Sequence, residues 1–121
     1  MSDLLSEFPR VAVVSPGEQL HVANAAGFKH KVLDLIMEGE RNILVDFEDT
    51  TFIDSTGLGT LVSLLRLVRG HGGDLRLANL NDDLRDLFML TRLETVFEIG
   101  QTREQAFVHF MLSRPAGEMT A

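Results

Sequence analysis

Apolar residues recur along this chain in two ways, as short runs and at helical spacing. The runs are typical of buried strands, and they fall at Val11–Val14, Ile43–Val45, Leu75–Ala78 and Val96–Ile99. Helical spacing predicts four helices, at about residues 23–37, 58–69, 82–90 and 102–112. This alternation predicts an α/β fold, a mixed sheet of four to five strands with mostly parallel neighbours and about four helices.

Turn and cap residues separate these elements. Ser15-Pro16-Gly17 indicates a turn, Gly39 a helix stop, and Gly70-His71-Gly72-Gly73 the end of the next helix. Asn81 or Asp82 is a suitable N-cap, and Thr102 with Gln105 fits a capping box. We therefore expect one domain over residues 1–121 with its core at about 11–112. Residues 4–8 are a candidate edge strand and 115–121 a flexible tail.

Composition narrows the function classes. The 121 residues include no cysteine and carry a net charge of −7, which argues against disulfides, thiolate metal sites and nucleic-acid binding. The four histidines lack the spacing of a helical zinc site, so we expect no metal. The acidic N-terminus does not fit a signal peptide, and no apolar run reaches the ~18 residues of a membrane span. A cytoplasmic protein without direct membrane contact is expected.

The segment Asp54-Ser55-Thr56-Gly57 stands where a buried strand gives way to a helix. Hydroxyl residues there are ordinary N-caps, and Gly57 and Gly59 fit a turn and close packing. However, one cap needs one side chain, and here three candidates stand in a row. The preceding acidic residues are Asp46, Glu48, Asp49 and Asp54, with no Lys or Arg among them. This indicates an acidic surface beside the hydroxyls.

The helix that follows is more apolar than one buried stripe requires. A helical wheel gives a core face of Leu58, Leu61, Val62, Leu65 and Val68. Leu64 falls on the flank of this face, and Leu67 falls nearly opposite its centre, beside Thr60 and Ser63. Apolar residues beyond one stripe indicate a second covering surface or a partner protein.

Residues 45–59, reading VDFEDTTFIDSTGLG, resemble the signature of STAS-domain anti-sigma factor antagonists: an apolar strand, an acidic loop and Asp-Ser-Ser/Thr-Gly-Leu-Gly. The resemblance continues to about residue 112. It implies the STAS fold and a non-enzymatic partner switch, phosphorylated at Ser55 by an anti-sigma factor that is a serine kinase with a histidine-kinase-like ATP fold. A phosphatase would reverse this, and ATP would bind the kinase, so no cofactor is expected here.

In this scheme the unphosphorylated chain binds the anti-sigma factor and releases a sigma factor. We expect a monomer or weak dimer. The expected partner-binding residues are Asp54, Ser55, Thr56, Gly57, Leu58, Thr60, Ser63, Leu64, Leu67, His21 and Asn24. Two positions depart from the family pattern, because His21 stands where an Asp is usual and Arg92 where a glycine is usual.

Two other classes of function remain open. A STAS subunit of a membrane transport complex, such as an ABC-type lipid transporter, would use the same fold as a docking module without a kinase. A small hydrolase is disfavoured, since Ser55 lacks the G-x-S-x-G context of a nucleophile elbow. Gly70-His71-Gly72-Gly73 is followed by a strand and lacks the Lys-Ser/Thr pair of a phosphate-binding loop.

Overall fold

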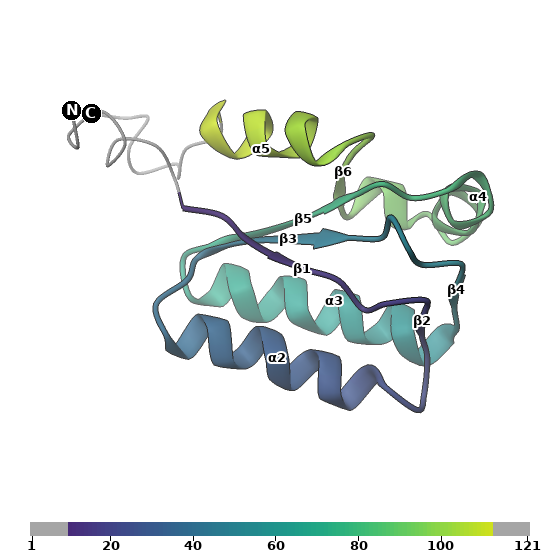
Figure 1. The fold of residues 1–121 in the computed structure, drawn as a ribbon, viewed down its shortest axis with the longest axis horizontal. Helices are drawn as coiled ribbons and strands as arrows, with labels where there is room; N and C mark the ends of the chain where they lie inside the picture. Colours follow the sequence, from purple (N-terminus) through teal and green to yellow (C-terminus); the bar gives the residue numbers. More distant parts are fainter. Residues whose placement is uncertain (1–9, 113–121) are drawn as a thin grey trace.

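The computed structural model describes residues 10–112. Its main sheet has four strands in the order β1 (Ala12–Val14), β3 (Asn42–Asp46), β5 (Asp74–Ala78) and β6 (Glu98–Gly100) (Figure 1). Every pairing in the described part is parallel. The predicted α/β fold is confirmed. The candidate edge strand at 4–8 lies outside the described residues, as does the tail from Pro115.

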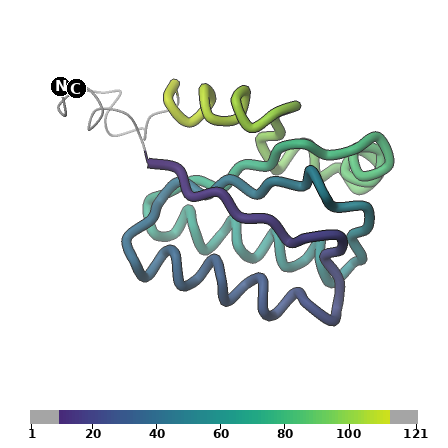
Figure 2. Tube along the Cα trace, in the orientation of Figure 1, coloured from purple at the N-terminus to yellow at the C-terminus, as the bar shows by residue number. Residues whose placement is uncertain are grey.

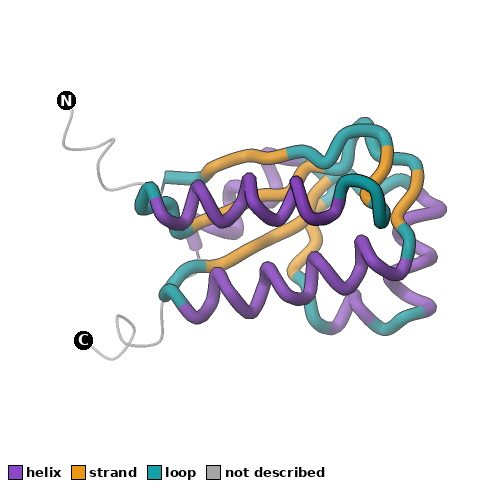
Figure 3. The backbone as a smooth tube through the Cα atoms, turned by 90° about the horizontal axis from the view of Figure 1, so that it is seen from below, coloured by secondary structure: helices purple, strands orange, loops and turns teal. Residues whose placement is uncertain are grey.

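Helices cover both faces of this sheet. The helices α2 (Ala25–Met37) and α3 (Ser55–Gly70) lie together on one face, and α5 (Arg103–Leu112) lies on the other (Figure 1). Viewed from the α2 and α3 side, the two long helices run next to each other across the strands (Figure 3). The helix α4 (Asp82–Leu90) and the 3₁₀ turn η1 (Leu93–Thr95) lie at one end.

A second, very short parallel sheet was not predicted. It joins β2 (Gln19–Leu20) to β4 (Phe52–Ile53), with Leu20 opposite Ile53. Each strand has two residues, too few for periodicity to show. The pairing joins the segment before α2 to the segment before α3.

The core has two parts, one on each face of the sheet. The larger lies under α2 and α3 and extends to Phe88 and Phe97, whose rings meet edge to face. The smaller lies under α5, where Ala106 and Phe110 pack on Leu44 and Ala78. The guanidinium of Arg76 also lies over the Phe110 ring, 5.3 Å from its centroid. Burial of these apolar side chains is what positions the helices.

Most helix ends follow the sequence prediction. The Asn81 side chain caps α4 by accepting from the N–H of Leu84. The Thr102 hydroxyl accepts from the N–H of Gln105, and the Gln105 side chain reaches back to the N–H of Gln101 rather than of Thr102. Arg92 adopts φ 62°, a left-handed conformation, which explains why glycine is usual there.

Candidate functional site

Two loops are joined at the carboxyl end of the sheet, beside the start of α3 (Figure 2). Besides the β2–β4 pairing, the N–H of Thr51 donates to the carbonyl of Glu18 at 2.8 Å, and the N–H of Asp54 donates to that of Leu20 at 3.2 Å. The Thr50 hydroxyl donates to the carbonyl of Gly17. These bonds connect segments about thirty residues apart in the sequence. They hold the loop that leads into α3 against the loop that leads into α2.

The side chain of Asp54 is the N-cap of α3. Its Oδ1 accepts from the N–H of Gly57 at 2.8 Å, and its Oδ2 accepts from the N–H of Val22 at 3.0 Å, in the loop before α2. The Gly57 bond lowers the pKa of Asp54, and the Val22 bond and the nearby His21 act in the same direction. The helix therefore begins at Ser55, three residues earlier than the wheel predicted.

Gly57 is required by packing and not by a partner. It is buried, and a Cβ there would lie 2.3 Å from the carbonyl oxygen of Leu20 and 2.9 Å from a methyl group of Ile53. The close approach lets α3 sit against the β2–β4 pair. The prediction that Gly57 contacts a partner is wrong, because the residue faces inward.

Ser55 and Thr56 remain exposed at the first turn of α3. Since Asp54 supplies the cap, neither hydroxyl is needed for it. Within residues 10–112 the Ser55 side chain has no hydrogen-bond partner. Within the described part of the chain, the structure thus presents two unengaged hydroxyls, those of Ser55 and Thr56, to solvent beside the N-terminus of α3.

The buried stripe of α3 is rotated relative to the wheel prediction. Leu64 is fully buried with 0% exposure, so its prediction as a partner contact is wrong. Leu58 and Val62, predicted to belong to the core face, are only partly buried. Leu67, expected to point away from the core, is also partly buried and packs against it. A helical wheel of α3 contains no information on where α2 packs. The position of α2 decides which side chains on the two sides of the α3 core face are buried.

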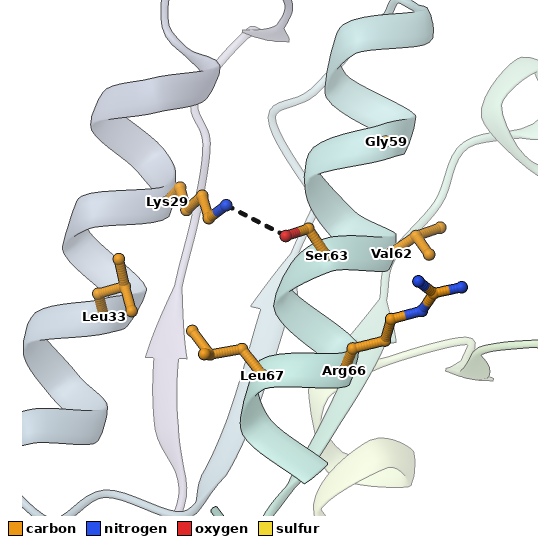
Figure 4. Close-up of a pocket in the computed structure, with 7 residues that line it drawn as sticks. All are labelled: Lys29, Leu33, Gly59, Val62, Ser63, Arg66 and Leu67. Carbon is orange, nitrogen blue, oxygen red and sulfur yellow. Dashed lines mark hydrogen bonds between the residues drawn. The ribbon is translucent and has the colours of Figure 1, made fainter. Parts of the chain in front are cut away.

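A groove of about 630 Å³ runs over the outward side of α3 beside α2 (Figure 4). From the predicted partner-binding set it includes Ser63 and Leu67, while Thr60 is partly buried nearby on the same helix. The lining is Lys29, Leu33, Gly59, Val62, Ser63, Arg66 and Leu67. Sequence reasoning missed Lys29, Leu33 and Arg66, because only the packing of α2 on α3 brings them together.

His21 and Asn24, the two predicted contacts outside α3, lie in the loop before α2. The Asn24 side chain holds this loop, accepting from the N–H of His21 at 2.9 Å and donating to the carbonyl of Gln19 at 2.7 Å. His21 is partly exposed next to the Val22 N–H that binds Asp54. The structure thus brings His21 to the Asp54 end of α3 and gives Asn24 a bracing role.

Asp46 does not belong to the exposed acidic surface that the sequence indicated. It is 2% exposed and accepts hydrogen bonds from the Asn79 amide, the Arg103 guanidinium and the N–H of Glu48. Burial alone would raise the pKa of Asp46, but these three donors outweigh it and the pKa is lowered. This cluster joins α5 to the sheet, which sequence proximity could not reveal because Arg103 is 57 residues away.

Residues 10–112 contain no cluster of three His, Cys, Asp or Glu side chains suited to a metal ion. In the same residues, no helix has the length and hydropathy of a membrane-crossing segment. The candidate functional site of the described residues therefore consists of Ser55 at the start of α3 and the groove beside α2.

Comparisons of the sequence and of the structure with known proteins find similar proteins of one domain family. Residues 5–106 match the profile of the STAS domain. The chain is 31% identical over 86 residues to the anti-sigma-B factor antagonist of Bacillus subtilis, covering 71% of this chain and 78% of that one. The crystal structure of an anti-sigma factor antagonist from Thermotoga maritima superposes with a TM-score of 0.77 at 29% identity, covering 83% and 86% of the two chains.

A third match is the phosphorylated form of the Bacillus cell fate determinant SpoIIAA. Its TM-score is 0.63 at 23% identity, and the match covers 82% of this chain and 89% of that one. At this identity the likeness concerns the fold alone.

Proposed function

This chain belongs to the STAS domain family, and we propose that it is an anti-sigma factor antagonist switched by phosphorylation of Ser55. In its unphosphorylated form it binds an anti-sigma factor that is also a serine kinase, and a sigma factor is released. Phosphate on Ser55 ends the binding, and a phosphatase restores it. The Bacillus subtilis relative described above is named an anti-sigma-B factor antagonist, which supports the binding part of this proposal.

The observation that carries the proposal is the exposed, unengaged Ser55 hydroxyl on a braced helix start. A kinase must reach the acceptor oxygen without unfolding the chain, and Ser55 meets this condition because Asp54 already caps α3. The braced loops also hold the hydroxyl in one position, which lowers the entropy cost of docking.

A phosphate at Ser55 is expected to change binding and not folding. It adds about −1.5 to −2 charges, which a helix N-terminus favours. The cost falls on the interface, where a docked partner would have to desolvate the phosphate. A loss of about 3 kcal/mol weakens binding more than a hundredfold.

ATP belongs to the partner in this scheme. The kinase binds the nucleotide through its histidine-kinase-like fold, and this chain contributes the acceptor hydroxyl and a docking surface. The proposal assigns no catalytic residue to the chain and places it in the cytoplasm with the kinase and phosphatase.

The test is phosphorylation by purified candidate kinases of this fold from the same genome. Each is incubated with ATP and the wild-type chain, and the modified residue is located by mass spectrometry. We expect one kinase to modify Ser55, to leave Ser55→Ala unmodified, and to bind Ser55→Ala at least about a hundredfold more tightly than Ser55→Asp.

Thr56→Ala is the matched control, since it removes the neighbouring exposed hydroxyl. It is expected to be phosphorylated as fast as wild type. Modification of Thr56 in place of Ser55 would move the site, and equal affinity for Ser55→Ala and Ser55→Asp would remove the electrostatic basis of the switch.

A further inference from the structure

The groove between α2 and α3 has a charge opposite to that of the chain. The net charge is −7, yet Lys29 and Arg66 line the groove and no carboxylate does. The five ion pairs within residues 10–112 involve neither of these cations. Lys29 instead donates from Nζ to the Ser63 hydroxyl at 3.1 Å. Two cations without a counter-charge among these ion pairs therefore line one groove of an acidic protein, Lys29 on the α2 side and Arg66 on the far side of α3 (Figure 4).

The floor of the groove is apolar, and it has a notch at Gly59 where no side chain is present. Leu33 from α2 and Leu67 from α3 face each other, and Val62 lies across α3 (Figure 4). A Cβ at Gly59 would meet no atom within 4 Å, so its missing side chain leaves free space at the surface. An apolar side chain of another molecule fits over this notch, next to Lys29 and Ser63.

The groove lies on the same side of α3 as the phosphorylation site. Ser55, Gly59 and Ser63 follow each other at intervals of four residues, so they share one stripe of the helix. One such interval is about 6 Å along the axis. A segment that occupies the groove therefore reaches Ser55 within about two turns.

From these observations we infer that the α2–α3 groove receives an acidic, apolar segment of the anti-sigma factor, whose carboxylates pair with Lys29 and Arg66. This rests on the proposed function and names the chemistry of the partner's surface. Charge complementarity is the reason to choose this occupant, because a segment with Asp or Glu beside Leu- or Phe-type residues matches both the cations and the floor.

A phosphate on Ser55 would act on a segment bound in the groove although Ser55 lies about two helical turns from Ser63. An anionic segment that passes Ser55 is repelled by the added negative charge of phosphoserine, in addition to the desolvation cost. The same phosphate beside a basic segment would instead strengthen binding. The positive charge of the groove selects an anionic segment, and phosphorylation therefore weakens binding and does not strengthen it.

The experiment uses the kinase that phosphorylates Ser55, with ADP present, and the chain carrying Ser55→Ala so that it stays unmodified. Calorimetry compares Lys29→Glu and Arg66→Glu with Lys31→Glu, a matched charge change on the exposed part of α2 outside the groove. We expect about tenfold or greater loss of affinity for each groove variant and less than about twofold for Lys31→Glu. Lys29→Gln, which keeps a hydrogen-bond donor for Ser63, is expected to lose affinity too.

Several results would overturn the inference. Unchanged affinity of both groove variants would do so, as would an equal loss for Lys31→Glu, which would indicate only the overall field. Tighter binding after removal of residues 1–9 would show that this acidic segment of the chain occupies the groove. A dimer in sedimentation velocity that Lys29→Glu dissociates would make a second copy the occupant.

Failure of the function and failure of the groove give different results. If no kinase modifies or binds the wild-type chain, the proposed function fails before the groove is tested. If a kinase modifies Ser55 and binds the groove variants normally, only the groove assignment fails. Thermal melts of each variant confirm that the compared proteins are folded.

Discussion

Two aspartates near the carboxyl end of the sheet make similar hydrogen bonds in opposite surroundings. Asp46 ends β3 and is 2% exposed, whereas Asp54 caps α3 at the surface. Each accepts from donors on separate segments, and in each case the pKa is lowered. The same chemistry therefore serves two positions that differ in burial and in what they connect.

The difference shows which carboxylate the fold depends on and which one the site depends on. The donors to Asp46 include Asn79, just after β5, and Arg103 on α5, so the carboxylate joins two layers of the molecule. The donors to Asp54 are the N–H groups of Val22 and Gly57, so it joins a loop to a helix start. Loss of Asp46 is expected to loosen the domain, and loss of Asp54 to displace Ser55.

The largest effect is expected from Asp46→Ala. It leaves the Asn79 amide and one side of Arg103 without their buried acceptor, which costs about 2–3 kcal/mol of unfolding free energy. Urea denaturation followed by circular dichroism measures the change. Asp49→Ala is the control, because Asp49 is exposed in the same acidic loop. If the two variants were equally stable, the buried cluster would not contribute to stability.

At the Asp54 end of the sheet, the next largest effect is expected from the close packing of α3 on β2. Gly57→Ala places a Cβ against the backbone of Leu20 and is expected to cost about 1–3 kcal/mol. Gly59→Ala, on the same helix, meets open space and is expected to add about 0.5–1 kcal/mol through helix propensity. Both are measured in urea. A stabilised Gly57→Ala would mean that α3 does not depend on its close approach to β2.

Gly59→Ala also separates stability from binding. Its methyl group fills the notch of the α2–α3 groove, so affinity for the kinase is expected to fall while stability rises. Calorimetry with the kinase that phosphorylates Ser55 measures this. Equal or tighter binding would indicate that the partner does not use the notch.

Periodicity in the sequence predicted the helices and the main strands, which are long enough to show it. It did not predict elements that depend on contacts between distant segments. The four main strands, the helices and the Asn81 cap follow from periodicity and cap chemistry in short windows. The strands β2 and β4 have two residues each, so no period exists to read. The start of α3 was placed late because the three cap candidates could be distinguished only by geometry.

The candidate site was predictable in its centre and not at its edges. Ser55 followed from the resemblance in residues 45–59, and the structure leaves it exposed. Leu64 was assigned to the flank of the core face because a helical wheel gives the direction of each side chain but not the elements that pack against it. Lys29 and Arg66 come together only when α2 packs on α3, and Asp46 meets Arg103 only across two layers. Long-range packing decided each of these cases.

Two substitutions at Asp54 distinguish its role as a cap from the role of its charge. Asparagine is as good an N-cap as aspartate, whereas alanine is not. Asp54→Asn is therefore expected to keep the cap on Gly57 and Ser55 phosphorylation, but to lose the bond from the N–H of Val22 and part of the stability, because its amide has only one acceptor oxygen. Asp54→Ala is expected to lower the urea midpoint by less than Gly57→Ala and to slow phosphorylation about tenfold, because Ser55 loses its fixed position. Slow phosphorylation of both variants would mean that the kinase reads the charge of Asp54.

The smallest effect near neutrality is expected from pH. Because the folded-state pKa of each carboxyl is lowered, its stabilisation is present above the unfolded value of about 3.9 and is lost as pH falls through the folded value. Between pH 7 and 5 these two groups leave stability unchanged, and below about pH 4 both weaken it. Urea midpoints of wild type and Asp46→Asn at pH 7, 5, 4 and 3 measure the Asp46 part, with Asp49→Asn as control. The gap between wild type and Asp46→Asn narrows in acid, since protonated Asp46 has already lost its charge; a constant gap would indicate that Asp46 acts through shape and not through ionisation.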